Sequence, residues 1–323
     1  MLWRGDFHNA RQLLDALARR IDRRAARGRD KVFSARERFH RMRQARAQRA
    51  QLLSMLLLPL ETGYQVPLPR APEVREACAA AFGPDEESAV IALRELQGVI
   101  AAQQWHEKGV FVPALEGRIH PHFGVFSPVR GEYVDLVAEA PLPAFDVAFD
   151  IGTGSGVLAA VLARRGVCHV VATDQDARAV ACARDNLARL GVDERVQLQQ
   201  TDLFPAGRAP LIVCNPPWLP GKPTSPLEHA VYDPGSRMLK GFVHGLPEHL
   251  TAEGEAWLVI SDLAEHLELR SRDDLLKLFD AAGLSVLGRL ETRPRHERAA
   301  QQDDPLHFAR SREVTSLWRL ALR

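Results

Sequence analysis

Four apolar runs in the chain are each followed by residues that could bind a ligand. Glycines allow a ligand to approach the backbone closely, and carboxylate or amide oxygens accept hydrogen bonds from hydroxyl and amino groups. Parallel strands end at one edge of a sheet, where open α/β sheets bind their ligands, so we expect these residues to lie together. They are Asp150 with Gly152, Gly154 and Gly156, then Asp174, Asp202 and Asn215.

The glycine turn lies in a strand–turn–helix–strand unit over residues 145–176. A dinucleotide-binding turn needs its third glycine where this chain has Val157, and Asp150 would repel an anionic pyrophosphate. The same acid suits S-adenosylmethionine, which carries a cationic amino group and a cationic sulfonium. Asp174 follows at a spacing that lets a carboxylate reach ribose hydroxyls. The charge pattern favours S-adenosylmethionine over NAD, and a dehydrogenase is the alternative.

The sequence Asn215-Pro216-Pro217-Trp218 predicts a site for a planar amino group. Two consecutive prolines take the chain out of the sheet on a rigid path and offer no N–H groups. The Asn215 side-chain oxygen and the Pro216 carbonyl could then accept both N–H bonds of an NH2 group, while Trp218 offers a flat surface for stacking. Accepting both bonds raises the electron density on nitrogen and directs it toward a methyl donor.

The order of the expected elements predicts an α/β fold with a doubly wound, seven-stranded, Rossmann-like sheet. Five strand–helix repeats come first, and two adjacent strands, at 285–292 and 314–322, then form an antiparallel hairpin at one edge. Residues 1–108 show helical patterns and predict an N-terminal helical domain. Residues 109–128 are expected to form a linker hairpin, and residues 129–323 the catalytic domain.

The charge of the chain is distributed unevenly. Residues 1–50 contain 15 Lys and Arg against 5 Asp and Glu, whereas the whole chain has a formal net charge of only +1. This basic segment predicts contact with nucleic acid or an acidic partner, and a solvated helical face is the alternative. No apolar run reaches the ~20 residues that span a membrane. The four cysteines form no CxxC pair, so we predict no metal site and a cytoplasmic location.

The segment FDIGTGSG (149–156), the acids Asp174 and Asp202, and NPPW (215–218) resemble the class I S-adenosylmethionine-dependent methyltransferases. They are most similar to the branch that methylates amino nitrogens. That branch includes the release-factor glutamine methyltransferases and the enzymes that methylate adenine or guanine amino groups of nucleic acids. The helical N-terminal domain and hairpin look like the release-factor enzymes, which have Tyr where this chain has Trp218.

The resemblance implies a role for each motif residue. Asp150 and the turn from Gly152 through Thr153 to Gly156 would line the methionine part of the cofactor. Asp174 and Gln175 would bind the ribose, and Asp202 with Leu203 the adenine. Residues 215–218 would be catalytic by orienting the target nitrogen, with Asn215 also close to the cofactor. By the same resemblance, the acceptor would be a nucleic-acid base or a protein glutamine of the translation machinery. A small-molecule N-methyltransferase and a non-catalytic cofactor-binding or ribosome-assembly module are the alternatives.

Overall fold

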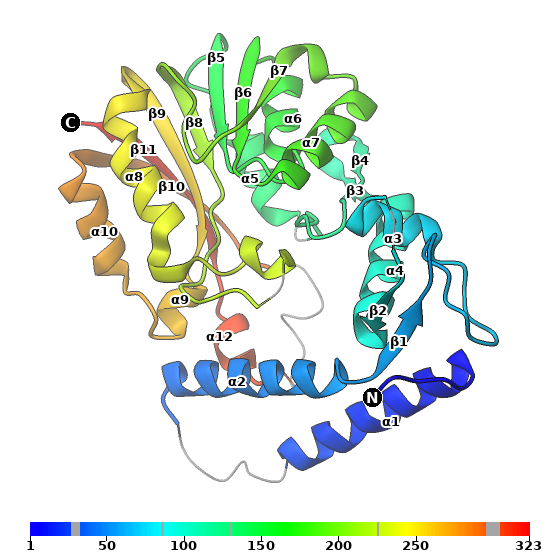
Figure 1. Ribbon diagram of the computed structural model, residues 1–323. Coiled ribbons are helices and arrows are strands. Elements are labelled where there is room, and N and C mark those ends of the chain that lie inside the picture. Colours follow the sequence, from blue (N-terminus) through cyan, green and yellow to red (C-terminus); the bar gives the residue numbers. More distant parts are fainter. Residues whose placement is uncertain (27–32, 85–86, 130, 225, 295–303) are drawn as a thin grey trace. The chain divides into compact units, whose positions relative to one another are not determined.

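The computed structural model describes residues 1–26, 33–84, 87–129, 131–224, 226–294 and 304–323. The chain divides into two compact units, Met1–Lys108 and Gly109–Arg323, which we call the N-terminal and C-terminal units (Figure 1). Within the described residues, no helix is both long enough and apolar enough to cross a membrane.

The N-terminal unit consists mainly of helices and also contains a small sheet that the sequence pattern did not predict. Strands β1 and β2 pair antiparallel, with Leu57 opposite Ala92. The sequence pattern assigned both segments to helices, because a short apolar run does not distinguish a strand from a buried helix. The elements are α1 (Phe7–Ala26), α2 (Ala35–Leu53), β1 (Leu57–Leu60), α3 (Arg75–Phe82), β2 (Ala89–Ala92) and α4 (Leu93–Lys108).

The basic segment at the start of the chain is part of this unit. Phe7, Ala10 and Leu14 on α1 and Phe39 on α2 are buried, and the Trp3 N–H donates to the Leu57 carbonyl at 2.8 Å. The described part of residues 1–50 therefore packs as two helices within this unit and is not a free arm. Residues 27–32 of the segment lie outside the described residues.

The C-terminal unit contains a hairpin and the predicted seven-stranded sheet. The hairpin pairs β3 (Val110–Val112) with β4 (Gly117–Ile119). The sheet has the order β10-β11-β9-β8-β5-β6-β7, and β11 runs in the opposite direction to the other six strands. Its strands are β5 (Val147–Ile151), β6 (His169–Asp174), β7 (Val196–Gln200), β8 (Ala209–Cys214), β9 (Leu250–Ser261), β10 (Leu284–Thr292) and β11 (Thr315–Leu322).

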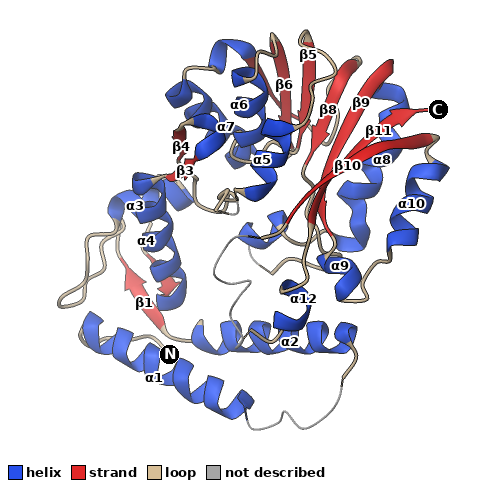
Figure 2. Ribbon diagram, turned by 180° about the vertical axis from the view of Figure 1, so that it is seen from behind, coloured by secondary structure: helices blue, strands red, loops and turns tan. Residues whose placement is uncertain are grey.

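Helices cover both faces of this sheet, as Figures 1 and 2 show from opposite sides. Alternate residues of each central strand enter two separate hydrophobic clusters; in β5, for example, Ala148 packs on one side and Phe149 on the other. This two-sided burial explains why the strands are almost continuously apolar. One face carries α5 (Glu132–Glu139), α6 (Val157–Arg164) and α7 (Ala177–Leu190), and the other carries α8 (Arg237–His249) and α10 (Arg272–Ala281). Two short helices, α9 (Leu263–His266) and α12 (His307–Arg310), are also described.

Gly156 brings α6 close to α7. Its φ is +82°, and a Cβ at this position would lie 3.1 Å from both the Cα and the Cβ of Ala183. Gly191, at the end of α7, has a similar φ of +66° but nothing within 4 Å of such a Cβ. Substituting Gly191 measures backbone strain alone, whereas substituting Gly156 measures the same strain together with a steric clash.

We expect Gly156→Ala to lower the free energy of unfolding by about 2–4 kcal/mol, because it adds overpacking to left-handed strain. Gly191→Ala should cost only the strain, about 1–2 kcal/mol. Urea unfolding followed by circular dichroism measures both. Equal losses for the two variants would show that the close approach of α6 and α7 does not constrain the turn.

Candidate active site

The ends of four neighbouring strands lie in register at one edge of the sheet. Ile151 at the end of β5 pairs with Cys214 of β8 and with Thr173 of β6, so Gly152 and Asn215 leave the sheet side by side. Asp174 pairs with Gln200 at the end of β7, two residues before Asp202. The structure therefore brings the residues selected from the sequence to one edge.

The glycine turn is held by hydrogen bonds to the end of β6. The N–H groups of Gly152 and Thr153 both donate to the Thr173 carbonyl, at 2.9 and 2.8 Å. The Gly154 N–H donates to the Asp174 carboxylate at 3.0 Å. One wall of the turn comes from α8, since a Cβ on Gly152 would meet the Met238 methyl at 2.3 Å.

Asn186 on α7 also holds the turn, and the sequence reasoning missed it. It is fully buried; its amide oxygen accepts the His120 N–H at 2.7 Å, and its Nδ2 donates to the Ser155 carbonyl at 3.0 Å. It thus links the exit of the β3–β4 hairpin to the glycine turn. A buried asparagine on an amphipathic helix was the available signal, because such a side chain needs hydrogen-bond partners.

Two acids of the site are poorly solvated. Asp150 is 1% exposed, and its Oδ2 accepts from the Thr153 hydroxyl at 2.6 Å and the Ala159 N–H at 3.1 Å. Burial raises the pKa of Asp150 to about 6, although these hydrogen bonds act in the opposite direction. Burial also raises the pKa of Asp174. Burial deprives the charged carboxylates of water, and a cation bound nearby would replace that lost stabilisation. The two acids therefore favour a cationic ligand.

Asp202 and Leu203 lie against the start of α8. The Asp202 carboxylate is half exposed and forms an ion pair with Arg237, the first residue of that helix. Leu203 has a left-handed backbone, with φ +65°, and a Cβ on Gly241 would meet its side chain at 2.5 Å. The sequence did not predict that α8 borders these two residues. Gln175 is exposed beside them, and its carbonyl accepts from the Gln200 side chain at 3.3 Å.

The Asn215–Trp218 segment is arranged by an internal hydrogen bond. The Trp218 indole N–H donates to the Asn215 side-chain oxygen at 2.8 Å. The Trp218 ring packs against the hydrophobic clusters of both sheet faces, and Pro216 is buried while Pro217 is half-buried. A carbonyl oxygen has two lone pairs, so the Asn215 oxygen can accept one further hydrogen bond.

Asp233 fixes the loop that follows this segment and is a second residue that motif reasoning left without a role. It is 5% exposed, and its backbone N–H donates to the Leu219 carbonyl at 2.9 Å. Its carboxylate accepts the Leu239 N–H at 3.2 Å. Asp233 thereby connects the segment after Trp218 to the first turn of α8.

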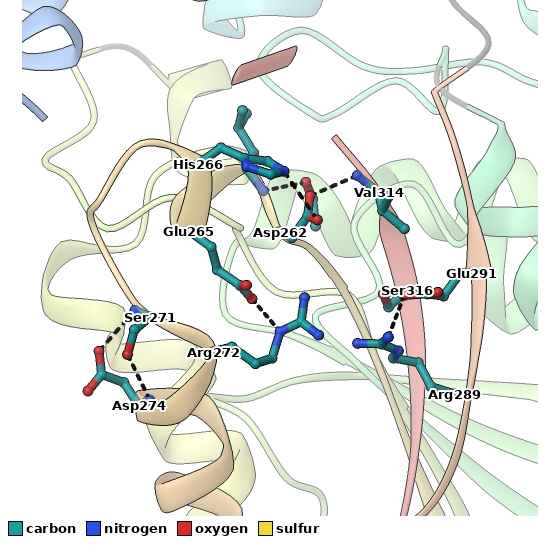
Figure 3. A network of polar contacts seen from close by, with 12 residues as sticks. Asp262, Glu265, His266, Ser271, Arg272, Asp274, Arg289, Glu291, Val314 and Ser316 are labelled. Atoms are coloured by element: carbon teal, nitrogen blue, oxygen red, sulfur yellow. Dashed lines mark hydrogen bonds and ion pairs between the residues drawn. The ribbon is translucent and has the colours of Figure 1, made fainter. Parts of the chain in front are cut away.

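The end of β9 is occupied by its own polar network, shown in Figure 3. The Asp262 carboxylate accepts the Val314 N–H at 2.7 Å and lies 3.3 Å from the His266 ring. Nearby, Arg272 pairs with Glu265 at 2.7 Å. The bond between Asp262 and Val314 fastens the start of β11 to the end of β9. The polar groups at this strand end therefore stabilise the sheet, whereas the ends of β5 to β8 are arranged around the glycine turn.

Comparison with known proteins identifies the family. The model of the methyltransferase small domain family matches residues 116–282, more than half of the chain. The chain belongs to this family. Its members are S-adenosylmethionine-dependent methyltransferases, as the sequence resemblance predicted. The fold and the class of cofactor inferred from the residues are therefore confirmed.

Three relatives illustrate the range of this methyltransferase family. The chain is 32% identical over 180 residues to the release factor glutamine methyltransferase of Cereibacter sphaeroides, covering 51% of this chain and 63% of the relative. It is 47% identical over 66 residues to the ribosomal protein L11 methyltransferase of Symbiobacterium thermophilum, covering 20% and 22%. It is 32% identical over 145 residues to the tRNA1(Val) (adenine(37)-N6)-methyltransferase of Shewanella amazonensis, covering 43% and 62%. The chain matches less than two thirds of the length of each.

The residues at the sheet edge fit the methyltransferase cofactor. Three carboxylates gather there, those of Asp150, Asp174 and Asp202, and two of them have pKa values raised by burial. S-adenosylmethionine would bring two cationic groups and hydroxyl and amino donors, which complement such acids. The glycine turn also leaves its backbone open to close approach, because Gly154 has nothing within 4 Å of a Cβ position.

Cofactor affinity should depend on pH through Asp150. Its folded-state pKa is raised to about 6, so the carboxylate that attracts cations is ionised above that pH and lost as the pH falls through it. We expect the affinity for S-adenosylmethionine to fall about 3- to 10-fold between pH 7.5 and pH 5. S-adenosylhomocysteine, which lacks the sulfonium charge, should lose less. Isothermal titration calorimetry measures both ligands.

Asp150→Asn is the control for this pH dependence. The amide keeps the acceptor for Thr153 and Ala159 but does not titrate, so the difference between the two ligands should become nearly independent of pH. A slope that persists unchanged in this variant would assign the titration to another group.

Proposed function

We propose that the chain transfers a methyl group from S-adenosylmethionine to a planar amino nitrogen of a macromolecule. The observation that carries this proposal is the position of Asn215–Trp218 directly beside the glycine turn, with Ile151 and Cys214 paired in register. Methyl transfer requires that the methyl donor and the nitrogen that accepts the methyl group are held close together, and neighbouring strand ends would provide the two sites.

The cofactor assignment follows the order of the strand ends. The turn from Gly152 to Gly156, supported by Asp150, would hold the methionine part. Asp174 and Gln175, at the end of β6, would hold the ribose hydroxyls. Asp202 and Leu203, after β7, would hold the adenine. Support comes from the hydrogen bonds that fix each segment and from the acids, whose charges complement the cofactor.

The acceptor nitrogen would be oriented by Asn215 and Pro216. The bond from Trp218 fixes the Asn215 amide so that its oxygen offers one remaining lone pair, and the Pro216 carbonyl provides the second acceptor. By accepting both N–H bonds, these two oxygens would raise the electron density on nitrogen and direct its lone pair toward the methyl donor. When bound, S-adenosylmethionine would supply an electrophilic methyl group: the N–C bond would form as the S–C bond breaks, with that electron pair kept by the thioether sulfur. The proton lost from nitrogen passes to solvent.

The names of the relatives support an amino nitrogen as the target but differ in the molecule that carries it. One acts on a release-factor glutamine and another on the N6 group of a tRNA adenine. An amide and an adenine share a conjugated NH2 group, which fits the two acceptors. We therefore propose a glutamine of a translation protein or a nucleic-acid base as the target, and a cytoplasmic location, which the four free cysteines favour.

Asn215→Ala should lower kcat at least ~100-fold, because it removes an acceptor that acts on the nitrogen during transfer. The affinity for S-adenosylhomocysteine should stay within about threefold, since the turn is held by other residues. The assay measures tritium transfer from labelled S-adenosylmethionine to RNA and protein from a deletion strain. Mass spectrometry of nucleosides and tryptic peptides then locates the methyl group. A non-catalytic binding module would show no transfer even by the wild-type chain.

The two helices α1 and α2 would provide a basic surface for the macromolecule. Several of their arginines are exposed, among them Arg20 and Arg46. Residues 1–50 contain 15 Lys and Arg against 5 Asp and Glu, and long-range attraction by such a surface would favour polyanionic partners.

The salt dependence of RNA binding tests this surface. Removing two phosphate contacts with Arg20→Gln and Arg46→Gln should reduce the slope of log affinity against log salt by about 1.5. The matched control changes Arg184 and Arg189 of α7 to Gln, which alters the net charge equally on another surface. Equal effects of the two double variants would show that net charge, and not the basic helices, governs binding.

A further inference from the structure

Leu203 adopts a backbone conformation that leucine avoids. Its φ of +65° lies in the left-handed region, which is strained for a residue with a Cβ. Strained residues of this kind persist only where surrounding contacts hold them, and they gather at ligand sites. Leu203 follows Asp202 directly, so the strain lies where the proposed function places the adenine.

One hydrogen bond holds the strained segment from beneath. The Thr173 hydroxyl donates to the Leu203 carbonyl at 2.6 Å, and Thr173 is fully buried in β6. No sequence motif singles out this threonine. Without the hydroxyl, the Leu203 carbonyl would lose this bond, and the left-handed turn would lose a contact that opposes its strain.

The same residue also holds the glycine turn. The Thr173 carbonyl accepts the N–H groups of Gly152 and Thr153, so its backbone and its side chain reach the two opposite ends of the cofactor site. Its burial prevents direct contact with a ligand. Any influence on binding must therefore pass through the residues it holds.

We propose that Thr173 is a positioning residue for adenine recognition: its hydroxyl holds Leu203 in the left-handed conformation that presents Asp202 to the adenine amino group. This inference rests on the proposed function for the placement of the adenine. It assigns to a buried strand residue a task that the motif residues cannot perform by themselves.

The test compares two ligands that differ at one group. S-adenosylhomocysteine carries the adenine amino group, and S-inosylhomocysteine carries a carbonyl oxygen in its place. In isothermal titrations of the full chain, Thr173→Val, which removes only the hydroxyl, should weaken S-adenosylhomocysteine about tenfold. S-inosylhomocysteine should change less than about threefold, because it already lacks the donor.

Two variants serve as controls. Thr173→Ser keeps the hydroxyl and should bind S-adenosylhomocysteine within about threefold of wild type. Thr315 in β11 is also fully buried, and its hydroxyl has no hydrogen-bond partner among the described residues. Thr315→Val therefore makes the same chemical change without losing a bond and should leave both affinities unchanged. If Thr173→Val does not fold, Thr173→Cys, which has a weaker donor, should show the same selective loss at a smaller size.

The proposal is overturned if Thr173→Val binds S-adenosylhomocysteine within twofold of wild type, or if it loses both ligands by the same factor. Asp202→Ala separates this failure from failure of the proposed site. That variant should abolish the preference for S-adenosylhomocysteine; a preference that survives would place the adenine elsewhere and overturn both assignments. Methyl transfer by the wild-type chain is scored independently of all these titrations.

Discussion

Two hydrogen bonds to a single carbonyl oxygen fix the glycine turn on which the proposed ligand site depends. The N–H groups of Gly152 and Thr153 converge on the Thr173 carbonyl, at 2.9 and 2.8 Å, and so fasten the turn after β5 to the end of β6. The turn can make this approach only because β5 and β6 are paired in register and because no side chain projects from Gly152 toward Met238. The adjacent strand ends then bring the remaining polar groups to the same edge.

Desolvated acids give this edge its electrostatic character. Asp150 is buried beneath the turn, and its raised pKa means that its ionisation above pH 6 costs the folded state free energy. A cationic ligand offsets that cost, so fold stability and cofactor binding are linked through one carboxyl group. The half-exposed pair of Asp202 and Arg237 contributes little by comparison, because solvent screens it.

The sequence was sufficient for the sheet and for the strand ends at which the selected polar residues lie, since both depend on local patterns. Apolar runs ending in glycine or an acid predicted the parallel strands, and Ser285–Leu322 predicted the edge hairpin. Features that depend on distant contacts were not accessible: the pairing of β1 with β2, the left-handed Leu203, and the approach of Met238 to Gly152. Trp218 was predicted in part: an indole ring at this position suggested stacking, but the hydrogen bond from its N–H to the Asn215 side chain could not be predicted.

The central claim is that the cofactor lies across the ends of β8, β5, β6 and β7, with the acceptor nitrogen presented beside Asn215. A crystal structure with S-adenosylhomocysteine tests it most directly. We expect the thioether next to Asn215, the ribose at Asp174 and the adenine at Asp202. Electron density for the ligand at another surface, or an Asn215 side chain turned away from the sulfur, would contradict the account.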